Sequence, residues 1–204
     1  MSRTSSLFFS WVQGAQFYVD VHSDAVNLLP RTDNATWLDV GCGPGLMTRL
    51  AASRGYNAIG IDRDPTMIHA ATHLARRENR CQFEVGLVDR LAETHAANVV
   101  SAASLLFVLP NQAAALDQLW NCVCPGGTLL IVETTQNMTF SEACKVLPNL
   151  PRGRRLALAL WAQARNGRAV PASMFEALRG ASVTRTPLLH GMVAAWTIAK
   201  DRSP

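Results

Sequence analysis

The chain has 204 residues, of which 49% are hydrophobic and 17% charged, and its formal net charge is +4. This length favours a single domain over residues 1–204 with a sizeable core, and so small a positive charge is weak evidence for nucleic-acid binding. No apolar run approaches the ~18 residues of a membrane span, and five cysteines without paired C-x-x-C motifs argue against a disulfide framework and a zinc site.

We therefore expect no metal and no membrane contact. The N-terminus lacks the long apolar stretch of a secretory signal. Free cysteines suit a reducing compartment, so the cytoplasm is the expected location.

The first 34 residues predict two helices. Apolar side chains recur at helical spacing over Phe8–Val19 and form an aromatic stripe. A second, shorter helix is expected over Ser23–Leu29, because Pro30 cannot continue it.

From residue 36 onward, strand and helix patterns alternate, which is typical of a parallel sheet with helical crossovers. Asp64 followed by Pro65 is a good helix start, because a capping acid precedes a proline at the first helical position. The tripeptide Pro125-Gly126-Gly127 predicts a turn. Strands are expected at Thr36–Val40, Tyr56–Ile61, Cys81–Val85, Val99–Ala103 and Thr128–Glu133. Helices are expected at Leu46–Arg54, Pro65–Arg77 and Gln112–Cys122.

The end of the chain departs from this alternation. Phe140–Arg179 is expected to be helical and irregular. Two strand-like runs, Val183–Leu189 and Met192–Ile198, then flank the dipeptide His190-Gly191. Such a pair predicts an antiparallel hairpin.

The most informative segment is Trp37–Gly45. Its first four residues read as a buried strand, and glycines then occupy alternate positions up to Gly45, where a helix begins. Because glycine lacks a Cβ and tolerates positive φ, such a turn lets a ligand approach the backbone closely. A second acid, Asp62, ends the next strand, roughly 20 residues on, where a ribose-binding carboxylate belongs.

The spacing of the glycines distinguishes a dinucleotide-binding turn from one that binds another kind of cofactor. Dinucleotide-binding proteins use G-x-G-x-x-G, whereas here the spacing is G-x-G-x-G, with Asp39 two residues before the first glycine. An acid beside the turn would repel a phosphate and would suit a cationic ligand that bears an amino acid. The stretch Leu38–Ala71 resembles motif I and its continuation in class I S-adenosylmethionine-dependent methyltransferases, and a weaker similarity extends over Thr36–Lys200.

This resemblance implies a fold and an activity. The fold is α/β, a three-layer αβα Rossmann-like sandwich with a seven-stranded, mostly parallel sheet. The sheet ends in an antiparallel C-terminal β-hairpin, whose seventh strand lies between the fifth and the sixth. The activity is transfer of a methyl group from S-adenosylmethionine to an acceptor, which leaves S-adenosylhomocysteine.

The resemblance also implies which residues bind the cofactor. The glycines would let the backbone pass close to the methionyl group and the ribose. Asp39 would hold the ammonium group directly or through water, and Asp62 would accept hydrogen bonds from both ribose hydroxyls. Met67 either covers one face of the adenine or packs in the core. The complete set expected at the cofactor is Asp39, Gly41, Cys42, Gly43, Gly45, Asp62, Arg63, Met67, Leu87, Val88, Asp89, Ala103 and Ser104.

The exit of the third strand departs from the family's pattern. Leu87 stands where an acid usually accepts from the adenine amino group, and Asp89 follows two residues later. Either Asp89 or a backbone carbonyl replaces that acid; alternatively, Asp89 is a solvated residue at a helix start. The backbone amide of Leu87 or Val88 can still serve an adenine ring nitrogen. Ala103 and Ser104, at the end of the fourth strand, are expected on the sulfonium side.

Missing motifs narrow the acceptor. Amino-group methyltransferases commonly carry D/N-P-P-Y/F after the fourth strand, where this chain has Ala-Ala-Ser-Leu, and cytosine C5 enzymes need a Pro-Cys pair, which does not occur. We therefore expect a small-molecule acceptor and no nucleic acid. The alternatives are an RNA or protein methyltransferase of the same fold and a non-catalytic S-adenosylmethionine-binding module.

The substrate side is expected to be formed by residues 1–34 and by an insertion over residues 140–180. Trp11, Phe17 and Tyr18 are candidates for a pocket wall. Arg154 and Arg155 belong to a basic cluster that either binds a carboxylate or phosphate of the acceptor or forms a solvated face.

No catalytic residue can be assigned from the sequence, and the oligomeric state stays open. His22 and Tyr18 are candidates, His22 because its unperturbed pKa lies near neutrality and suits a general base. The alternative for His22 is a histidine of the core or the surface.

Overall fold

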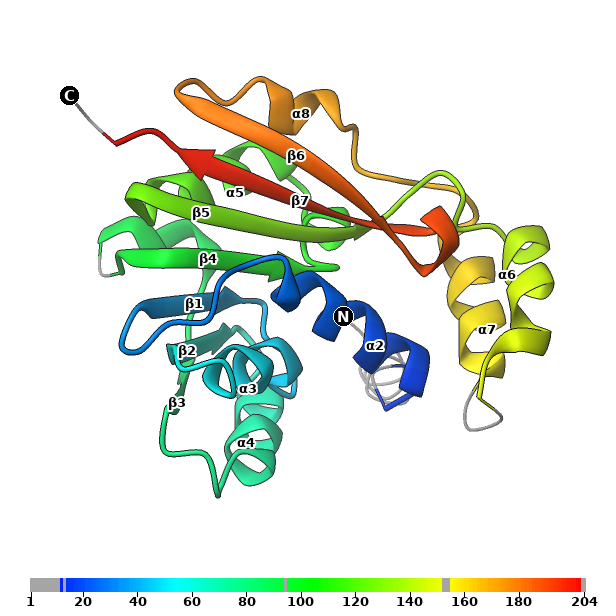
Figure 1. Ribbon diagram of the computed structural model, residues 1–204, viewed down its shortest axis with the longest axis horizontal. Coiled ribbons are helices and arrows are strands. Elements are labelled where there is room, and N and C mark those ends of the chain that lie inside the picture. The colour runs from blue at the N-terminus through cyan, green and yellow to red at the C-terminus, as the bar shows by residue number, and fades with distance from the viewer. Residues whose placement is uncertain (1–11, 13, 94, 152–154, 203–204) are drawn as a thin grey trace.

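A computed structural model shows a seven-stranded sheet in the order β3-β2-β1-β4-β5-β7-β6, flanked by helices (Figure 1). It describes residues 12, 14–93, 95–151 and 155–202. Strands β1 to β5 pair in parallel, and β7 runs antiparallel to both β5 and β6. The strands are β1 Thr36–Val40, β2 Asn57–Asp62, β3 Cys81–Val85, β4 Ala97–Ala103, β5 Val123–Thr134, β6 Ala181–Leu188 and β7 Val193–Lys200. The predicted fold class, with its inserted antiparallel strand, is confirmed.

Most strand ends lie within two residues of their predicted positions, but the start of β5 does not. The predicted turn Pro125-Gly126-Gly127 lies inside β5 and is wrong as a boundary. The ladder between β4 and β5 shifts register between Ala97 and Val99, and Gly126 has a φ of 76°. A Cβ on Gly127 would lie 2.6 Å from the backbone oxygen of Asn98. The glycines therefore permit a close, irregular pairing rather than a chain reversal.

The helices are α2 Gln16–Asn27, α3 Leu46–Ala52, α4 Pro65–Leu74, α5 Gln112–Asn121, α6 Phe140–Val146, α7 Leu156–Arg165 and α8 Ser173–Glu176. Short 3₁₀ segments are η1 Val88–Glu93, η2 Leu106–Val108, η3 Leu147–Asn149 and η4 Leu189–Gly191. The irregular region between β5 and β6 thus contains three helices.

The predicted boundary between the two N-terminal helices is wrong, because α2 runs without a break through the expected gap at residues 20–22, and the chain is instead non-helical at Gly14 and Ala15. His22 made the pattern look polar there. In the structure its ring lies on the buried face of α2 with Tyr18, Val21 and Ala25, so the apolar stripe continues. The part of the predicted first helix over residues 8–11 lies outside the described residues.

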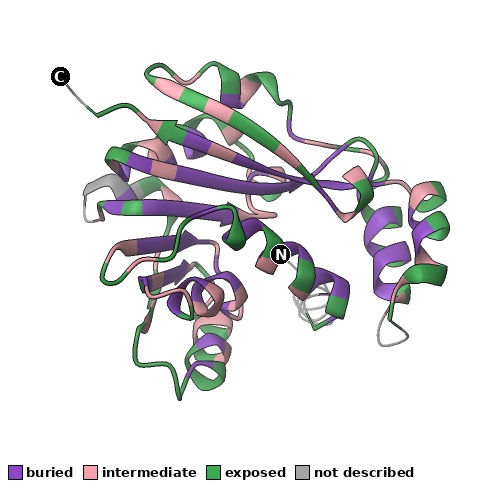
Figure 2. Ribbon diagram, viewed as in Figure 1, coloured by how far each residue is buried: buried purple, intermediate pink, exposed green. Residues whose placement is uncertain are grey.

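Two apolar clusters fill the two sides of the sheet. One side packs against α2, α3 and α7, with Trp37 and Trp161 among its largest buried side chains. The other packs against α5 and α8, where the rings of Phe175 and Trp196 lie 4.9 Å apart. Figure 2 shows the central strands buried along most of their length. None of the helices described is long and apolar enough to cross a bilayer.

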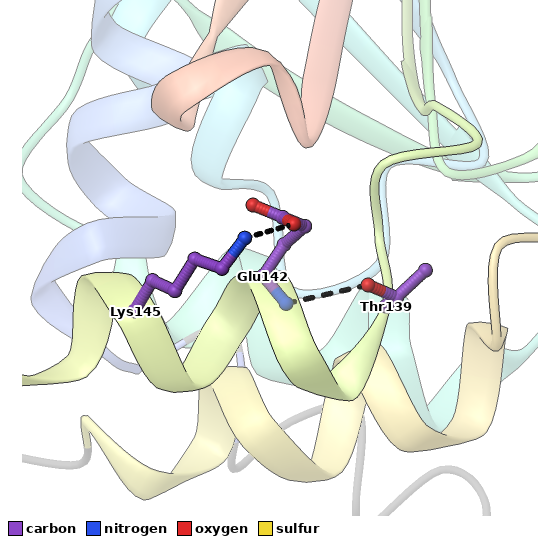
Figure 3. Close-up of polar contacts among 3 residues, drawn as sticks. All are labelled: Thr139, Glu142 and Lys145. Atoms are coloured by element: carbon purple, nitrogen blue, oxygen red, sulfur yellow. Dashed lines mark hydrogen bonds and ion pairs between the residues drawn. The ribbon is translucent and has the colours of Figure 1, made fainter.

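Helices α6 and α7 lie side by side at one end of the molecule (Figure 1). Thr139 caps α6, because its side-chain oxygen accepts from the backbone N–H of Glu142 at 3.3 Å (Figure 3). One turn on, the Lys145 ammonium donates to Glu142 at 2.6 Å. Helix α7 places Trp161 against Tyr18 of α2, with ring centroids 5.7 Å apart. The insertion is thereby attached to the N-terminal helix.

Candidate functional site

A cavity of about 690 Å³ opens at the carboxyl edge of the parallel strands. Its walls come from the glycine turn after β1 and from the ends of β2, β3 and β4. The strand order reverses between β1 and β4, and in open α/β sheets ligands bind at such a point. The volume lies within the range of small-molecule sites.

The turn after β1 has left-handed backbone at each alternate glycine. The φ angles of Gly41, Gly43 and Gly45 are 70°, 52° and 75°. A Cβ on Gly41 would lie 2.8 Å from the Leu105 side chain, and one on Gly45 would lie 2.6 Å from the Phe83 ring. The left-handed conformation therefore favours glycine at all three positions, and Gly41 and Gly43 leave bare backbone facing the cavity.

Asp62 links the end of β2 to this turn. One of its carboxylate oxygens accepts from the backbone N–H of Gly43 and the other from that of Asp64, both at 2.9 Å. Each carboxylate oxygen accepts more than one hydrogen bond, so Asp62, which lines the cavity, retains acceptor capacity toward a ligand. The predicted cap of α4 is confirmed, because Asp64 accepts from the N–H of Thr66 at 2.9 Å.

Asp39 points into the protein. It is 1% exposed, and its two oxygens accept from the hydroxyls of Thr48 at 2.7 Å and Ser101 at 2.9 Å. Ser101 in turn accepts from the indole N–H of Trp37 at 2.8 Å. Burial raises the pKa of Asp39 to about 6, and the two hydroxyl hydrogen bonds oppose that rise. Asp39 does not line the large cavity.

A second cavity of about 20 Å³ separates Asp39 from α2. Its lining includes Tyr18, His22, Gly41 and Cys42. This volume admits one water molecule. Asp39 and the start of the glycine turn thus border this small space together.

His22 and Tyr18 cover the small cavity from α2. The Nδ1–H of His22 donates to the backbone oxygen of Tyr18 at 2.7 Å, and the two rings stack with centroids 4.1 Å apart. Burial lowers the pKa of His22 to about 4, so its imidazole is neutral at pH 7. A neutral imidazole can accept a proton, but this one is enclosed.

Most residues predicted for the cofactor line the large cavity. Those that do so are Gly41, Gly43, Asp62, Arg63, Met67, Leu87, Val88, Asp89, Ala103 and Ser104. Leu87 is 53% exposed at the cavity mouth, and Asp89 is exposed in the first turn of η1. Asp39 and Cys42 line the small cavity instead, and Gly45 is the N-cap of α3.

The residues predicted for the acceptor side are not brought together at either cavity, apart from Tyr18. Phe17 is buried against Trp161, with ring centroids 6.4 Å apart. Arg155 lies at the N-cap of α7 and lines neither cavity. Trp11 and Arg154 lie outside the described residues. Assignment of these residues to the acceptor stays a prediction.

Two features of the site were missed. An apolar wall of the large cavity follows β4 and consists of Leu105, Val108, Leu109 and Pro110. Glu133, at the end of β5, is buried and 1% exposed. The sequence carried a signal for each, since the wall directly follows Ser104 and Glu133 is the first charged residue after an apolar strand run.

No group of three or more His, Cys, Asp or Glu side chains that could hold a metal ion occurs within the described ranges.

Comparison with known proteins agrees with this geometry. A family model described as a methyltransferase domain matches residues 38–131. A ubiquinone biosynthesis O-methyltransferase of Psychrobacter arcticus is 32% identical over 105 residues, which are 49% of this chain and 41% of that protein. A trans-aconitate 2-methyltransferase of Methylobacterium radiotolerans is 33% identical over 96 residues, which are 46% of this chain and 36% of that protein. The alignments therefore span less than half of the length of these relatives.

A solved structure extends the likeness over the whole fold. Magnesium protoporphyrin IX methyltransferase from Synechocystis PCC 6803, with bound S-adenosylhomocysteine, matches with a TM-score of 0.67 at 15% identity. The match covers 98% of this chain and 95% of that one. The glycine turn, the strand order and the match of residues 38–131 to a methyltransferase domain thus agree, and the chain has the Rossmann-like fold found in S-adenosylmethionine-dependent methyltransferases.

Proposed function

We propose that this protein transfers a methyl group from S-adenosylmethionine to a small-molecule acceptor. The main support for this proposal is the large cavity, which is lined both by the backbone of the glycine turn and by the Asp62 carboxylate. A ligand that needs close backbone approach at one end and two hydroxyl partners in its middle fits this arrangement.

The residues present fit the donor from end to end. Gly41 and Gly43 accommodate the methionyl portion, because both line the cavity without a side chain and let the ligand approach the backbone. Asp62 accepts from the vicinal ribose hydroxyls through oxygens that are already oriented by two backbone N–H groups. Met67 and Leu87, both at the cavity, enclose the adenine with apolar surface.

The donor supplies a methyl carbon that is already activated by positively charged sulfur, so the protein's task is alignment. Alignment of nucleophile and methyl group accounts for ~7–11 kcal/mol of a barrier. Ala103 and Ser104 close the cavity at the end of β4 and limit where the acceptor atom approaches. Ser104 adopts a φ of 54°, which turns the chain sharply at this point.

A small acceptor is supported by the relatives and by the cavity wall. The two curated relatives carry names that refer to ubiquinone biosynthesis and to trans-aconitate. The wall formed by Leu105, Val108, Leu109 and Pro110 is apolar, which suits an acceptor with an apolar body. Tyr18, Phe17 and Arg155 remain candidates for its other side.

The test has two stages. In the first, S-adenosylhomocysteine is titrated calorimetrically into the protein, and absence of binding would refute the proposal. In the second, tritium-labelled donor is supplied with separate small-molecule, RNA and protein fractions of a cell extract. Label in the small-molecule fraction is expected. Label only in a macromolecular fraction would identify a methyltransferase of another substrate class, and binding without any labelling would indicate a cofactor-binding module.

A further inference from the structure

Glu133 is a buried acid that the proposed reaction does not yet use. It ends the apolar run of β5 and is 1% exposed. Its Oε1 accepts from the backbone N–H of Phe107 at 3.4 Å, and its Oε2 has no hydrogen-bond partner among the described residues. A buried carboxylate oxygen without a partner is costly, so its retention calls for an explanation.

Arg165 compensates this charge from α7. The side chain is 3% exposed and acts electrostatically on Glu133. Its guanidinium carbon lies 3.9 Å from the centroid of the Phe107 ring, and that of Arg168 lies 5.6 Å from the same ring. Phe107 is thus held twice, through its backbone by Glu133 and through its ring by Arg165.

Phe107 belongs to the segment that forms the apolar wall of the large cavity. Leu105, two residues before it, packs over the glycine turn, where a Cβ on Gly41 would meet it at 2.8 Å. Val108, directly after Phe107, lines the cavity mouth. A shift of Phe107 therefore moves the wall on both sides of it.

We infer that Glu133 is a positioning residue whose ionised carboxylate, together with Arg165, holds the segment 104–110 against the glycine turn and so sets the affinity of the donor site. This inference rests on the proposed function, because it assumes that the large cavity binds the methyl donor.

The hold on Phe107 depends on the charge of Glu133. Burial raises the pKa of Glu133 to about 7, and Arg165 and the N–H groups of Phe107 and Leu106 oppose that rise. A protonated carboxyl attracts Arg165 less and accepts more weakly from the N–H of Phe107. The other charged or titratable groups here, Arg168 and Tyr18, act on Arg165.

The experiment compares S-adenosylhomocysteine binding by the wild-type protein and by Glu133→Gln from about pH 5 to about pH 9. Glutamine keeps the size and an acceptor oxygen but not the charge. Wild-type affinity is expected to fall about fivefold as the pH drops through 7. This factor corresponds to the difference in strength between a hydrogen bond to a charged group and one to a neutral group. Glu133→Gln should bind S-adenosylhomocysteine with the weaker of the two affinities at every pH in this range.

A stability measurement separates positioning from simple packing. Since burial disfavours the ionised form, the stability of the glutamine variant relative to the wild type should rise as the pH increases through 7, while its relative affinity falls. If Glu133 only stabilised the fold, its replacement would change stability and binding affinity in the same direction. Glu142→Gln is the matched control, because it makes the same substitution at a carboxylate that pairs with Lys145 on α6 and lines neither cavity, and it should retain the step near pH 7.

Three outcomes are decisive. Failure of the wild-type protein to bind at any pH would refute the proposed function itself. Binding with the same affinity and pH profile in Glu133→Gln would overturn the positioning role and leave the proposed function intact. If that variant does not fold, Arg165→Lys decides: it keeps the charge but loses the planar contact with Phe107, and unchanged binding at pH 8 would overturn the inference.

Discussion

Three buried or half-buried carboxylates near the site differ in what surrounds them. Asp62 accepts only backbone N–H groups and faces the large cavity. Asp39 is enclosed by two hydroxyl donors, and Glu133 is held by backbone N–H groups and an arginine charge. Asp62 is therefore the carboxylate that is open to a ligand, whereas the other two act from behind the cavity wall.

The role of Asp62 can be tested by Asp62→Ala. The substitution removes the oxygens expected to accept from the ribose and should weaken S-adenosylhomocysteine binding by ~1.5–3 kcal/mol, as for hydrogen bonds to a charged group. Calorimetric titration gives the measurement. Asp20→Ala is the control, since Asp20 is exposed on α2, accepts from the Gln16 side chain at 2.8 Å and lines neither cavity. Equal affinity of the Asp62 variant and the wild type would remove Asp62 from the site.

At the scale of elements, α2 and α7 are held together by aromatic packing. Trp161 contacts Phe17 and Tyr18, and it lies one turn before Arg165 on the same helix. The predicted pocket wall at Phe17 is therefore part of the packing that fixes α7. Since Arg165 contacts the Phe107 ring, this packing also supports the cavity wall from a distance.

Replacing Trp161 by alanine should cost ~3–5 kcal/mol of unfolding free energy, because a large buried side chain leaves a cavity. Leu160→Ala, at the neighbouring position that is 51% exposed, should change stability by no more than ~0.5 kcal/mol. Urea denaturation measures both. Similar losses in the two variants would show that α7 does not dock through Trp161.

At the scale of the whole molecule, buried titratable groups make stability depend on pH in opposite directions. The folded pKa of Asp39 is raised from 3.8 to about 6, so its contribution to stability is lost as the pH rises through that window. The folded pKa of His22 is lowered from 6.5 to about 4, so stability is lost as the pH falls from 6.5 to 4.

Two variants separate these contributions. The stability of Asp39→Asn relative to the wild type should be greater at pH 8 than at pH 4, by on the order of 3 kcal/mol. For His22→Gln the relative stability should instead be greater at pH 4 than at pH 7. Chemical denaturation at each pH gives the differences. A pH-independent difference for either variant would mean that the group does not titrate as burial predicts.

Local patterns predicted the strands, the cap at Asp64 and the glycine turn, because each depends on neighbouring residues. Glycine adopts positive φ most readily, and alternation of polarity is typical of a strand. The pattern failed at His22 and at Pro125-Gly126-Gly127. There, packing against distant elements favoured a continuous helix and a continuous strand over what the local residues suggested.

The sequence by itself thus determined the kind of fold and the place of the glycine turn, since Gly41, Gly43 and Gly45 are the residues that most readily adopt its left-handed backbone. Only the tertiary structure decided which of the three acids faces the large cavity. Asp62 is open to the cavity, while Asp39 and Glu133 are enclosed by groups that lie far away in the chain. Burial and charge compensation arise from contacts between distant segments, and no local pattern encodes them.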